Sequence, residues 1–443
     1  MPSETGPLSF DVLKKAVRGS AAAVRLRVKL QPAGGTGAKV FPPTYIGGVY
    51  VTEARQLDGK RIECVLLDSV QSQANRLEQS LLQAYNDGKL KFPLLSVEFP
   101  EFPDIGAVTT LDAPHRIFDA ILRDSTLNNV PFRPQVKAKA EEEKGEKKKS
   151  KAAKDTPTPP AEVVSAEGSR VAMANVRFAT PLFELCPTAL VFGAWDSTGA
   201  AGGLGNKFAR AIVSEIIGVN VIEGERPASR IDPLGIEKGE IYEAKADASY
   251  VVEAEEAKTN EDGTPKVFKR KKEDKGRPSE INHSNIPPDI VKDDAGEPIG
   301  GGVTFDYAEQ TMVLSLAALR RLRFPVEIGK PSKSDADLTA RTVLAALALA
   351  AVAHQIDPPD YFLRSNCQLV LADEPVFELV VTANKTDRYT LTADQADTLF
   401  ADAVKEAKTA GLPWREEKII LTPKKALVDL VRRSRELGGG EGD

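Results

Sequence analysis

The residues between Leu66 and Arg76 include a dense run of hydrogen-bonding side chains. The set comprises serines, amides and an arginine: Ser69, Gln71, Ser72, Gln73, Asn75 and Arg76. These residue types contact the sugar and phosphate oxygens of nucleic acids. The density of amide groups favours a binding role, and the alternative is a well-capped helix that faces solvent.

A second candidate surface is basic and extended. Arg25, Arg27 and Lys29 alternate with apolar residues, so the sequence predicts a strand with one apolar face and one basic face. The basic face can contact phosphates or remain solvated, and we weigh these alternatives equally. Because the strand contains no aromatic residue, phosphate contact is favoured over base stacking.

A third candidate lies in residues 206–217, where the sequence predicts a helix. Lys207, Arg210 and Ser214 have the i, i+3, i+7 spacing of one helical face. A basic face beside a helix N-terminus can hold phosphates, and a solvated face is the equal alternative. The preceding glycine-rich turn, residues 199–205, is not followed by the Lys and Ser or Thr of a phosphate-binding loop, which disfavours nucleotide hydrolysis.

Residues 111–125 bring together His115, Arg116, Asp119 and Arg123. On a helix, Arg116, Asp119 and Arg123 would share a face and form ion pairs. The alternative is that His115, Arg116 or Arg123 contacts nucleic acid. A catalytic role for His115 as a general base lacks a second obvious acid or base.

Composition restricts the chemistry further. The 443 residues carry a net charge of −5, so any nucleic-acid site must be a local basic surface on an acidic body. Cys64, Cys186 and Cys367 lie far apart without metal-ligand spacing, and only three histidines occur, so we expect neither a metal site nor a cofactor. Isolated thiols are typical of a reducing cytoplasm.

The protein is expected to be soluble and cytoplasmic, with no membrane partner. Its N-terminus lacks the apolar core of a signal peptide. The longest apolar run, Val343–Ala353, is too short to span a bilayer and predicts a buried helix over about residues 336–354.

Two charged segments divide the chain. Residues 136–168 and 254–299 are rich in charge and poor in apolar side chains, which predicts flexible insertions, and the second is a candidate thumb or finger loop. The expected ordered blocks are residues 1–135, 169–253 and 300–443. Strands and helices follow one another without regular βαβ alternation, which favours an α+β fold.

Several elements must position the candidate residues. In the first block the sequence predicts a helix near Phe10–Val17 and another that begins at Asp68 or Ser69, with Asp68 and Gln71 as a capping box, and ends near Gly88. Apolar patterns predict strands at residues 22–30, 49–57, 61–69, 188–195, 367–373 and 377–383. Two further helices are expected at the C-terminal end.

The segments that carry these candidates resemble one known family. They read LQPAGGTGAKVFPPTY, VLLDSVQSQANRLE, LDAPHRIFDAILRDS, FGAWDSTG, KFARAIVSEIIG and LSLAALRRLRF. In this order they are similar to the backbone RAMP protein of type I-G (formerly I-U) CRISPR Cascade. The likeness extends over about residues 10–135 and 169–330.

The resemblance implies a modified RRM-like (ferredoxin-like) palm with inserted subdomains and a protruding thumb. It also implies a non-catalytic subunit for antiviral defence that stacks head to tail along CRISPR RNA and leaves bases free to pair with a target DNA strand. The implied partners are CRISPR RNA, further copies of the chain in a helical filament, the large Cascade subunit and a Cas five/six-type RAMP subunit.

Related type III subunits cut RNA with an aspartate, but the type I family recruits a separate nuclease, so Asp68, Asp112 and Asp124 are interpreted as structural.

Two alternatives stay open. One alternative is a RAMP endoribonuclease that processes precursor CRISPR RNA with His115 as base. The other is a protein scaffold without an RNA role, which would show no salt-dependent RNA binding.

Overall fold

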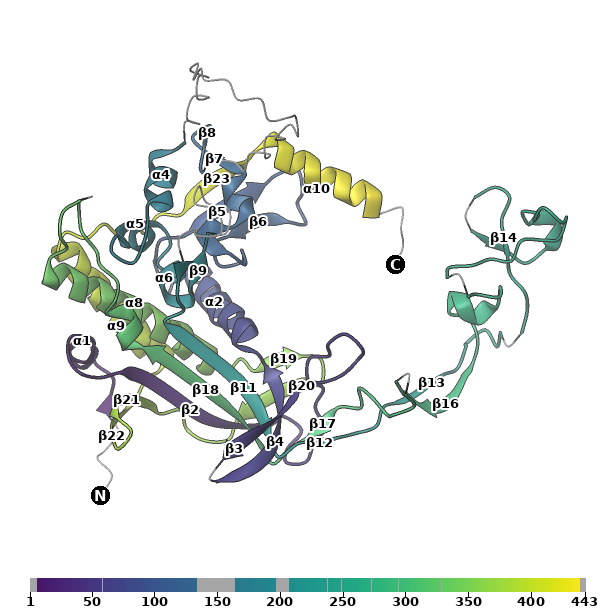
Figure 1. The fold of residues 1–443 in the computed structure, drawn as a ribbon, viewed down its shortest axis with the longest axis horizontal. Coiled ribbons are helices and arrows are strands. Elements are labelled where there is room, and N and C mark those ends of the chain that lie inside the picture. Colours follow the sequence, from purple (N-terminus) through teal and green to yellow (C-terminus); the bar gives the residue numbers. More distant parts are fainter. Residues whose placement is uncertain are drawn as a thin grey trace, which may run out of the picture.

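The computed structural model describes residues 6–57, 59–133, 164–196, 207–236, 238–247, 249–271, 273–293, 295–327 and 329–438. The fold is α+β and compatible with an RRM-like RAMP organisation. Figure 1 shows a large sheet with helices on one side, a smaller sheet beyond them, and a long arm that leaves the body.

The main sheet has ten strands. Its linear order is β1-β22-β21-β2-β18-β11-β4-β3, with the bounds β1 Gly6–Pro7, β22 Lys385–Thr390, β21 Phe377–Thr382, β2 Ala23–Pro32, β18 Tyr307–Ser315, β11 Ile212–Val219, β4 Lys60–Asp68 and β3 Thr52–Leu57. β20 (Cys367–Leu371) pairs with β2 and with β19 (Phe362–Arg364). The strands predicted near residues 22–30, 49–57, 61–69, 367–373 and 377–383 are confirmed.

Four helices gather on one side of this sheet (Figure 1): α1 Phe10–Arg18, α2 Val70–Asn86, α8 Ser334–Ile356 and α9 Ala393–Thr409. The apolar face of β2 is buried on this side. α8 contacts α1, α2 and α9 and is buried on nearly all sides, which its alanine-rich sequence permits. The predicted helices near residues 10–17 and 336–354 are confirmed.

The start of α2 differs from the expectation in one detail. Ser69, not Asp68, is the N-cap, and its hydroxyl accepts a hydrogen bond from the backbone N–H of Ser72. Asp68 is the last residue of β4, and its Oδ2 accepts hydrogen bonds from the side chains of Gln73 and Arg76, so the predicted capping box with Gln71 is wrong. The predicted end is confirmed, because Gly88 adopts a positive φ of 74° just after the helix.

The smaller sheet combines strands from both ends of the chain: β6 Gly106–Thr109, β5 Leu95–Phe99, β23 Ile419–Pro423, β7 Ser125–Leu127 and β8 Val130–Pro131. β23 lies parallel to β5 and antiparallel to β7. α10 (Lys425–Gly438) follows β23 and, with α9, confirms the two predicted C-terminal helices. The ordered blocks 1–135 and 300–443 therefore share one sheet.

Short helices connect the two sheets: η1 Arg116–Phe118, α3 Ala120–Arg123, α4 Ala166–Ala172, α5 Thr180–Leu185, α6 Thr188–Phe192 and α7 Leu316–Leu319. Most of the side chains of α5 and α6 are buried. They form the wall between the main sheet and the smaller sheet.

Two predictions of secondary structure are wrong. Residues 188–195 form α6 and the short strand β9 (Ala194–Trp195) instead of one strand. Residues 188–194 are buried, and a short apolar run of this kind has no periodicity that separates helix from strand. Residues 207–217 form β10 (Lys207–Phe208) and most of β11 instead of a helix, because tertiary pairing of β11 with β18 and β4 overrides the helical spacing.

A long arm, residues 221–304, extends from the edge of the main sheet (Figure 1). Its antiparallel pairs are β12 Ile222–Glu223 with β17 Val303–Thr304, β13 Pro227–Arg230 with β16 Ile286–Ile290, and β14 Tyr242–Glu243 with β15 Tyr250–Val251. Near the tip lie η3 (Ala254–Glu256) and η4 (Pro278–Ile281). The charged segment 254–299 thus contributes the tip and the returning side of the arm, where the sequence predicts a flexible insertion.

Two predicted features fall outside the described residues. These are most of the charged insertion 136–168 and the glycine-rich turn 199–205.

Candidate nucleic-acid interface

The first candidate site is a hollow of about 320 Å³, here called the Trp195 hollow. Its lining comes from three segments: residues 114–116, residues 192–195 and residues 207–210. It therefore brings together His115, Arg116, Lys207 and Arg210, which the sequence nominates in two separate segments. His115, Lys207 and Arg210 are exposed, and none of the three side chains forms an ion pair among the described residues.

Trp195 is the residue of this hollow that the sequence analysis missed. Its side chain is 45% exposed, although an indole normally gains by burial. In the β9–β10 pair, Trp195 lies directly opposite Lys207, so an aromatic face and a cation share one surface. A base can stack on such a ring while the cation holds a phosphate. The tryptophan is visible in the sequence FGAW, but the strand predicted over residues 188–195 gave no reason to expect its side chain to be exposed.

The backbone beside Trp195 requires glycine. Gly193 has a φ of 83°, and a Cβ atom at this position would lie 2.8 Å from a side-chain carbon of Arg210. This close approach places the chain of β9 against the segment that carries Arg210. Any larger residue would displace one wall of the Trp195 hollow.

Arg116 supports the hollow from behind. It is 6% exposed, its Nε and Nη2 donate to the carboxylate of Glu78 at 2.6 Å, and its Nη1 donates to the carbonyl oxygen of Gly193 at 2.8 Å. Its predicted role as an RNA contact is therefore corrected to a positioning role, because the guanidinium is buried and all three of its nitrogens donate to Glu78 or Gly193. Burial raises the pKa of Glu78 to about 7, and the positive charges of Arg116 and Arg210 oppose that shift.

The predicted ion pairs within residues 111–125 do not form. Arg116 bonds to Glu78, and Asp119 caps α3 by accepting from the backbone N–H of Ile121 at 3.0 Å. Arg123 pairs with its neighbour Asp124 at 2.7 Å. The predicted RNA contact of Arg123 is therefore not available, since its guanidinium is largely buried against that carboxylate.

The start of α2 separates into buried and exposed amides. Gln73 is 0% exposed, so its predicted RNA contact is wrong; its amide donates to Asp68 at 2.6 Å. Gln71, Asn75 and Gln79 instead form an exposed stripe at i, i+4, i+8. Gln79 was missed, although the i+4 spacing from Asn75 could have indicated it. The hydroxyl of Ser69 caps the helix by accepting from the backbone N–H of Ser72.

Gln73 belongs to a buried polar network. Its side-chain oxygen accepts from the Ser214 hydroxyl at 2.8 Å and from the Gln310 amide at 2.9 Å. Gln310 also donates to Gln355 at 2.9 Å and accepts from the Tyr361 hydroxyl at 2.7 Å. The network fixes α2 against β11, β18 and α8. Ser214 therefore faces the core and not the basic surface that the predicted helix would give it.

Arg76 joins α2 to a second hollow. It donates to Asp68 at 2.9 Å and to the carbonyl oxygens of Phe362 and Leu363 in β19. The second hollow, here called the Phe362 hollow, measures about 500 Å³ and lies between residues 32–41 and the β19–β20 hairpin. Phe362 is 56% exposed there.

The Phe362 hollow adjoins the root of the arm. Val40 pairs with Val303, and the side chain of Lys39 donates to the carbonyl oxygen of Glu225 at 3.3 Å. The exposed amides of Asn366 and Gln368 also line it. An exposed ring with amides and a lysine is a set of groups that can receive a nucleotide.

The basic face of β2 is present but is partly neutralised. Arg25 pairs with Glu378 of β21 at 2.6 Å, and Arg27 pairs with Glu309 of β18 at 2.9 Å. Lys29 lies 4.8 Å from the centre of the Tyr307 ring. Exposed pairs of this kind are weak, so phosphates could compete for the two arginines. The aromatic partner that β2 lacks comes from the neighbouring strand β18.

Within the described ranges, no group of three or more His, Cys, Asp or Glu side chains could hold a metal ion. The three cysteines are buried and free. α8 has the length and composition of a membrane span, but 94% of its most apolar window is buried inside the protein, as in the core helix of a soluble domain.

Residues 24–223 match the family of CRISPR-associated protein GSU0053 (Cas_GSU0053). This region of the chain is therefore similar to a CRISPR-associated protein family. It begins in β2, ends in β12 and contains every residue of the Trp195 hollow, so the best candidate site lies inside the matched region. No curated protein matches the chain.

Proposed function

We propose that the chain is a non-catalytic, RNA-holding backbone subunit of a type I-G Cascade-like CRISPR complex. The observation that carries the proposal is the Trp195 hollow. It combines an exposed indole with the side chains of His115, Lys207 and Arg210, which form no ion pair among the described residues, inside the region that matches a CRISPR-associated family.

The chemistry of these groups suits a guide RNA of any sequence. Cations hold phosphates and an aromatic face stacks on any base, so neither reads Watson–Crick edges. The exposed Gln71, Asn75 and Gln79 stripe adds groups for ribose and phosphate oxygens. Bases held in this way would stay free to pair with a target DNA strand, as in other RNA-guided systems.

The arm supports a second part of the proposal. Its length, and its root beside the Phe362 hollow, are suited to a thumb that reaches beyond one subunit, and the Phe362 ring could stack on a base beside that root. In this proposal further copies, the large subunit and a Cas five/six-type subunit complete the complex.

RNA binding tests the proposal directly. Fluorescence anisotropy with a labelled RNA of arbitrary sequence compares the protein with a Lys207→Ala/Arg210→Ala variant across a salt series. Because each lost phosphate contact removes a released counterion, we expect weaker binding and a salt slope reduced by about 0.7 per contact. Lys385→Ala, an exposed residue on β22, is the matched control.

Three outcomes would contradict the proposal. An unchanged salt slope in the double variant would place the RNA elsewhere. No RNA binding by the unmodified protein would favour a protein scaffold. Metal-independent cleavage of repeat RNA that is lost in His115→Ala would identify the chain as an endoribonuclease.

A further inference from the structure

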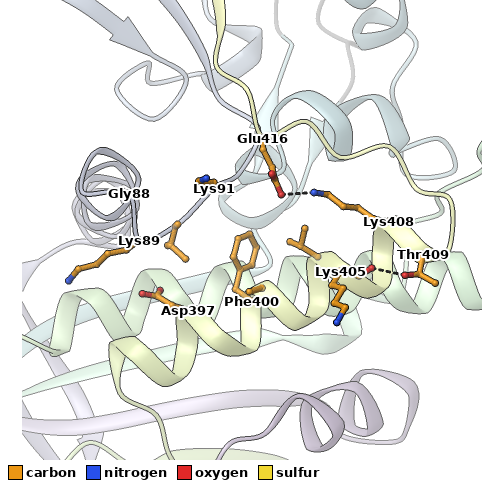
Figure 2. A pocket seen from close by; sticks show the side chains of 12 residues that line it. Gly88, Lys89, Lys91, Asp397, Phe400, Lys405, Lys408, Thr409 and Glu416 are labelled. Atoms are coloured by element: carbon orange, nitrogen blue, oxygen red, sulfur yellow. Dashed lines mark hydrogen bonds and ion pairs between the residues drawn. The ribbon is translucent and has the colours of Figure 1, made fainter.

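A groove with a basic rim lies on the helical side of the protein, away from the Trp195 hollow. It measures about 480 Å³ and lies between the segment after α2 and one face of α9 (Figure 2). Lys89 and Lys91 come from the segment, and Lys405 and Lys408 come from α9. We call this site the lysine groove.

Most of the positive charge of the lysine groove is uncompensated. Lys408 pairs with Glu416 at 2.5 Å, as the dashed line in Figure 2 shows. The carboxylate of Asp397 lies 2.7 Å from Nε2 of His354, which is its partner. Lys89, Lys91 and Lys405 form no ion pair among the described residues. On a chain of net charge −5, this is a local site for anionic groups.

The floor of the lysine groove is apolar and closed. Leu90, Phe400 and Val404 line it and are buried. Because Phe400 offers no exposed ring face, the groove lacks the stacking platform of a nucleic-acid site. Lysines around an apolar floor fit a peptide segment that carries carboxylates beside a small apolar side chain.

The tip of the arm presents such a segment. Val252 is 64% exposed, and it precedes the exposed carboxylates of Glu253, Glu255 and Glu256, none of which forms an ion pair among the described residues. We call residues 252–256 the acidic turn. Its shape is fixed by the backbone N–H of Lys245, which donates to the carbonyl oxygen of Glu256 at 3.1 Å.

Within one chain the acidic turn and the lysine groove lie far apart. In Figure 1 the arm carries its tip away from the body on the side opposite α9, so the acidic turn of a chain lies far from its own lysine groove. A contact between unlike surfaces of two copies is heterologous and leaves one free groove and one free turn at the ends, which allows further copies to add.

We propose that the acidic turn of one copy docks in the lysine groove of a second copy. Val252 would meet the apolar floor, and Glu253, Glu255 and Glu256 would meet Lys89, Lys91 and Lys405. The inference rests on the proposed function in one respect, which is that RNA aligns the copies in a row. The contact would then set the distance from one copy to the next.

Charge reversal at each surface tests this contact. The groove variant is Lys91→Glu/Lys405→Glu, and the turn variant is Glu253→Lys/Glu255→Lys. Mass photometry compares assembly on an RNA long enough for several copies with binding to an RNA that accommodates one. We expect each variant to lose at least about tenfold in assembly on the long RNA, with unchanged affinity for the short RNA.

Rescue provides the decisive comparison. An equal mixture of the two variants should assemble in alternation, because an acidic groove then meets a basic turn and a basic groove meets an acidic turn. Combining all four substitutions in one chain should also restore assembly. Lys385→Glu and Glu261→Lys are the matched controls, since both change an exposed charge outside the two surfaces.

The outcomes separate the contact from the proposed function. Intact assembly by either variant, or no rescue by the mixture, would overturn the contact. An equal loss of affinity for the short RNA would assign the groove to nucleic acid and also overturn it. If the unmodified protein binds neither RNA, the proposed function fails, and mixing the two variants without RNA at high concentration still tests the contact. Val252→Asp is a further variant that should weaken assembly without altering the groove.

Discussion

At the scale of single residues, Trp195 and the Glu78–Arg116 pair have different roles in the candidate site. Trp195 is exposed where a tryptophan has little structural reason to be, beside a lysine on the opposite strand. Glu78 and Arg116 are buried behind it and hold the wall that carries Gly193. One residue is available to a ligand, and the pair only positions the surface.

Replacement of Trp195 should affect RNA binding and leave the fold intact. Trp195→Ala should weaken RNA binding by about 1–3 kcal/mol, because a stacked base loses its platform, whereas Trp195→Phe should retain most of the affinity. The chain has two tryptophans, and Trp414 is buried, so quenching of the exposed tryptophan during RNA titration reports on this site. Equal affinities of Trp195→Ala and the unmodified protein would remove Trp195 from the interface.

The raised pKa of Glu78 predicts a pH dependence of stability. Burial raises this pKa from 4.5 to about 7, so the native state binds a proton that the unfolded state releases between these values. The contribution to stability is complete below about pH 4.5 and is lost as the pH rises through 7, by up to ~3 kcal/mol. Urea denaturation between pH 5 and 8 measures it.

Glu78→Gln provides the comparison for this pH dependence. The variant should show a flatter dependence of the unfolding free energy on pH, because its amide does not titrate. The exposed residue Glu98, changed to Gln, is the control and should behave as the unmodified protein. If the unfolding free energy of the unmodified protein and of Glu78→Gln changed with pH in parallel, Glu78 would not be the group responsible for the pH dependence.

At the scale of elements, the buried network centred on Gln310 connects α2, β11, β18 and α8. Gln310→Leu should lower the unfolding free energy by about 2–4 kcal/mol, because Tyr361, Gln73 and Gln355 would lose a buried hydrogen-bond partner. Gln71→Ala, at an exposed position on α2, should change it by less than about 0.5 kcal/mol. Chemical denaturation compares them, and similar values for both would show that the network has no special weight.

Local patterns predict part of the fold. The alternation of β2, the stripe and terminal glycine of α2, and the apolar run of α8 are each visible within one segment. The pattern Lys207, Arg210, Ser214 indicates a helix with equal clarity, yet β11 is a strand because β18 and β4 pair with it. Such pairing is decided by residues far away in the sequence.

The same limit applies to the candidate site. The sequence nominates His115, Lys207 and Arg210, and the structure places them around one hollow. The sequence does not indicate that Arg25 pairs with Glu378 or that Arg27 pairs with Glu309, because these partners lie hundreds of residues away. Nor does it separate the buried Gln73 from its exposed neighbours, since that requires the packing of α2 on the sheet.

At the scale of the whole molecule, the arm is attached to the body mainly through its root. Val291 donates to the carbonyl oxygen of Arg226 at 2.9 Å, so these two residues can be joined by an Asn-Gly turn in place of the residues between them. The shortened protein should keep its thermal midpoint within a few degrees and keep its affinity for a short RNA, but lose assembly on a long RNA. A lower short-RNA affinity would show that the arm itself holds RNA.

The order of strands in the two sheets has a consequence for synthesis on the ribosome. Among the described strands, β2 pairs only with strands that begin after residue 300, and one of the two partners of β5 is β23, near the end of the chain. About 275 residues separate β2 from β18, so at ~5–20 residues per second the nascent chain exposes an unpaired β2 for roughly 15–55 s. The protein must therefore fold after most of it has been made, and chaperones that shield nascent strands should determine its yield in the cell.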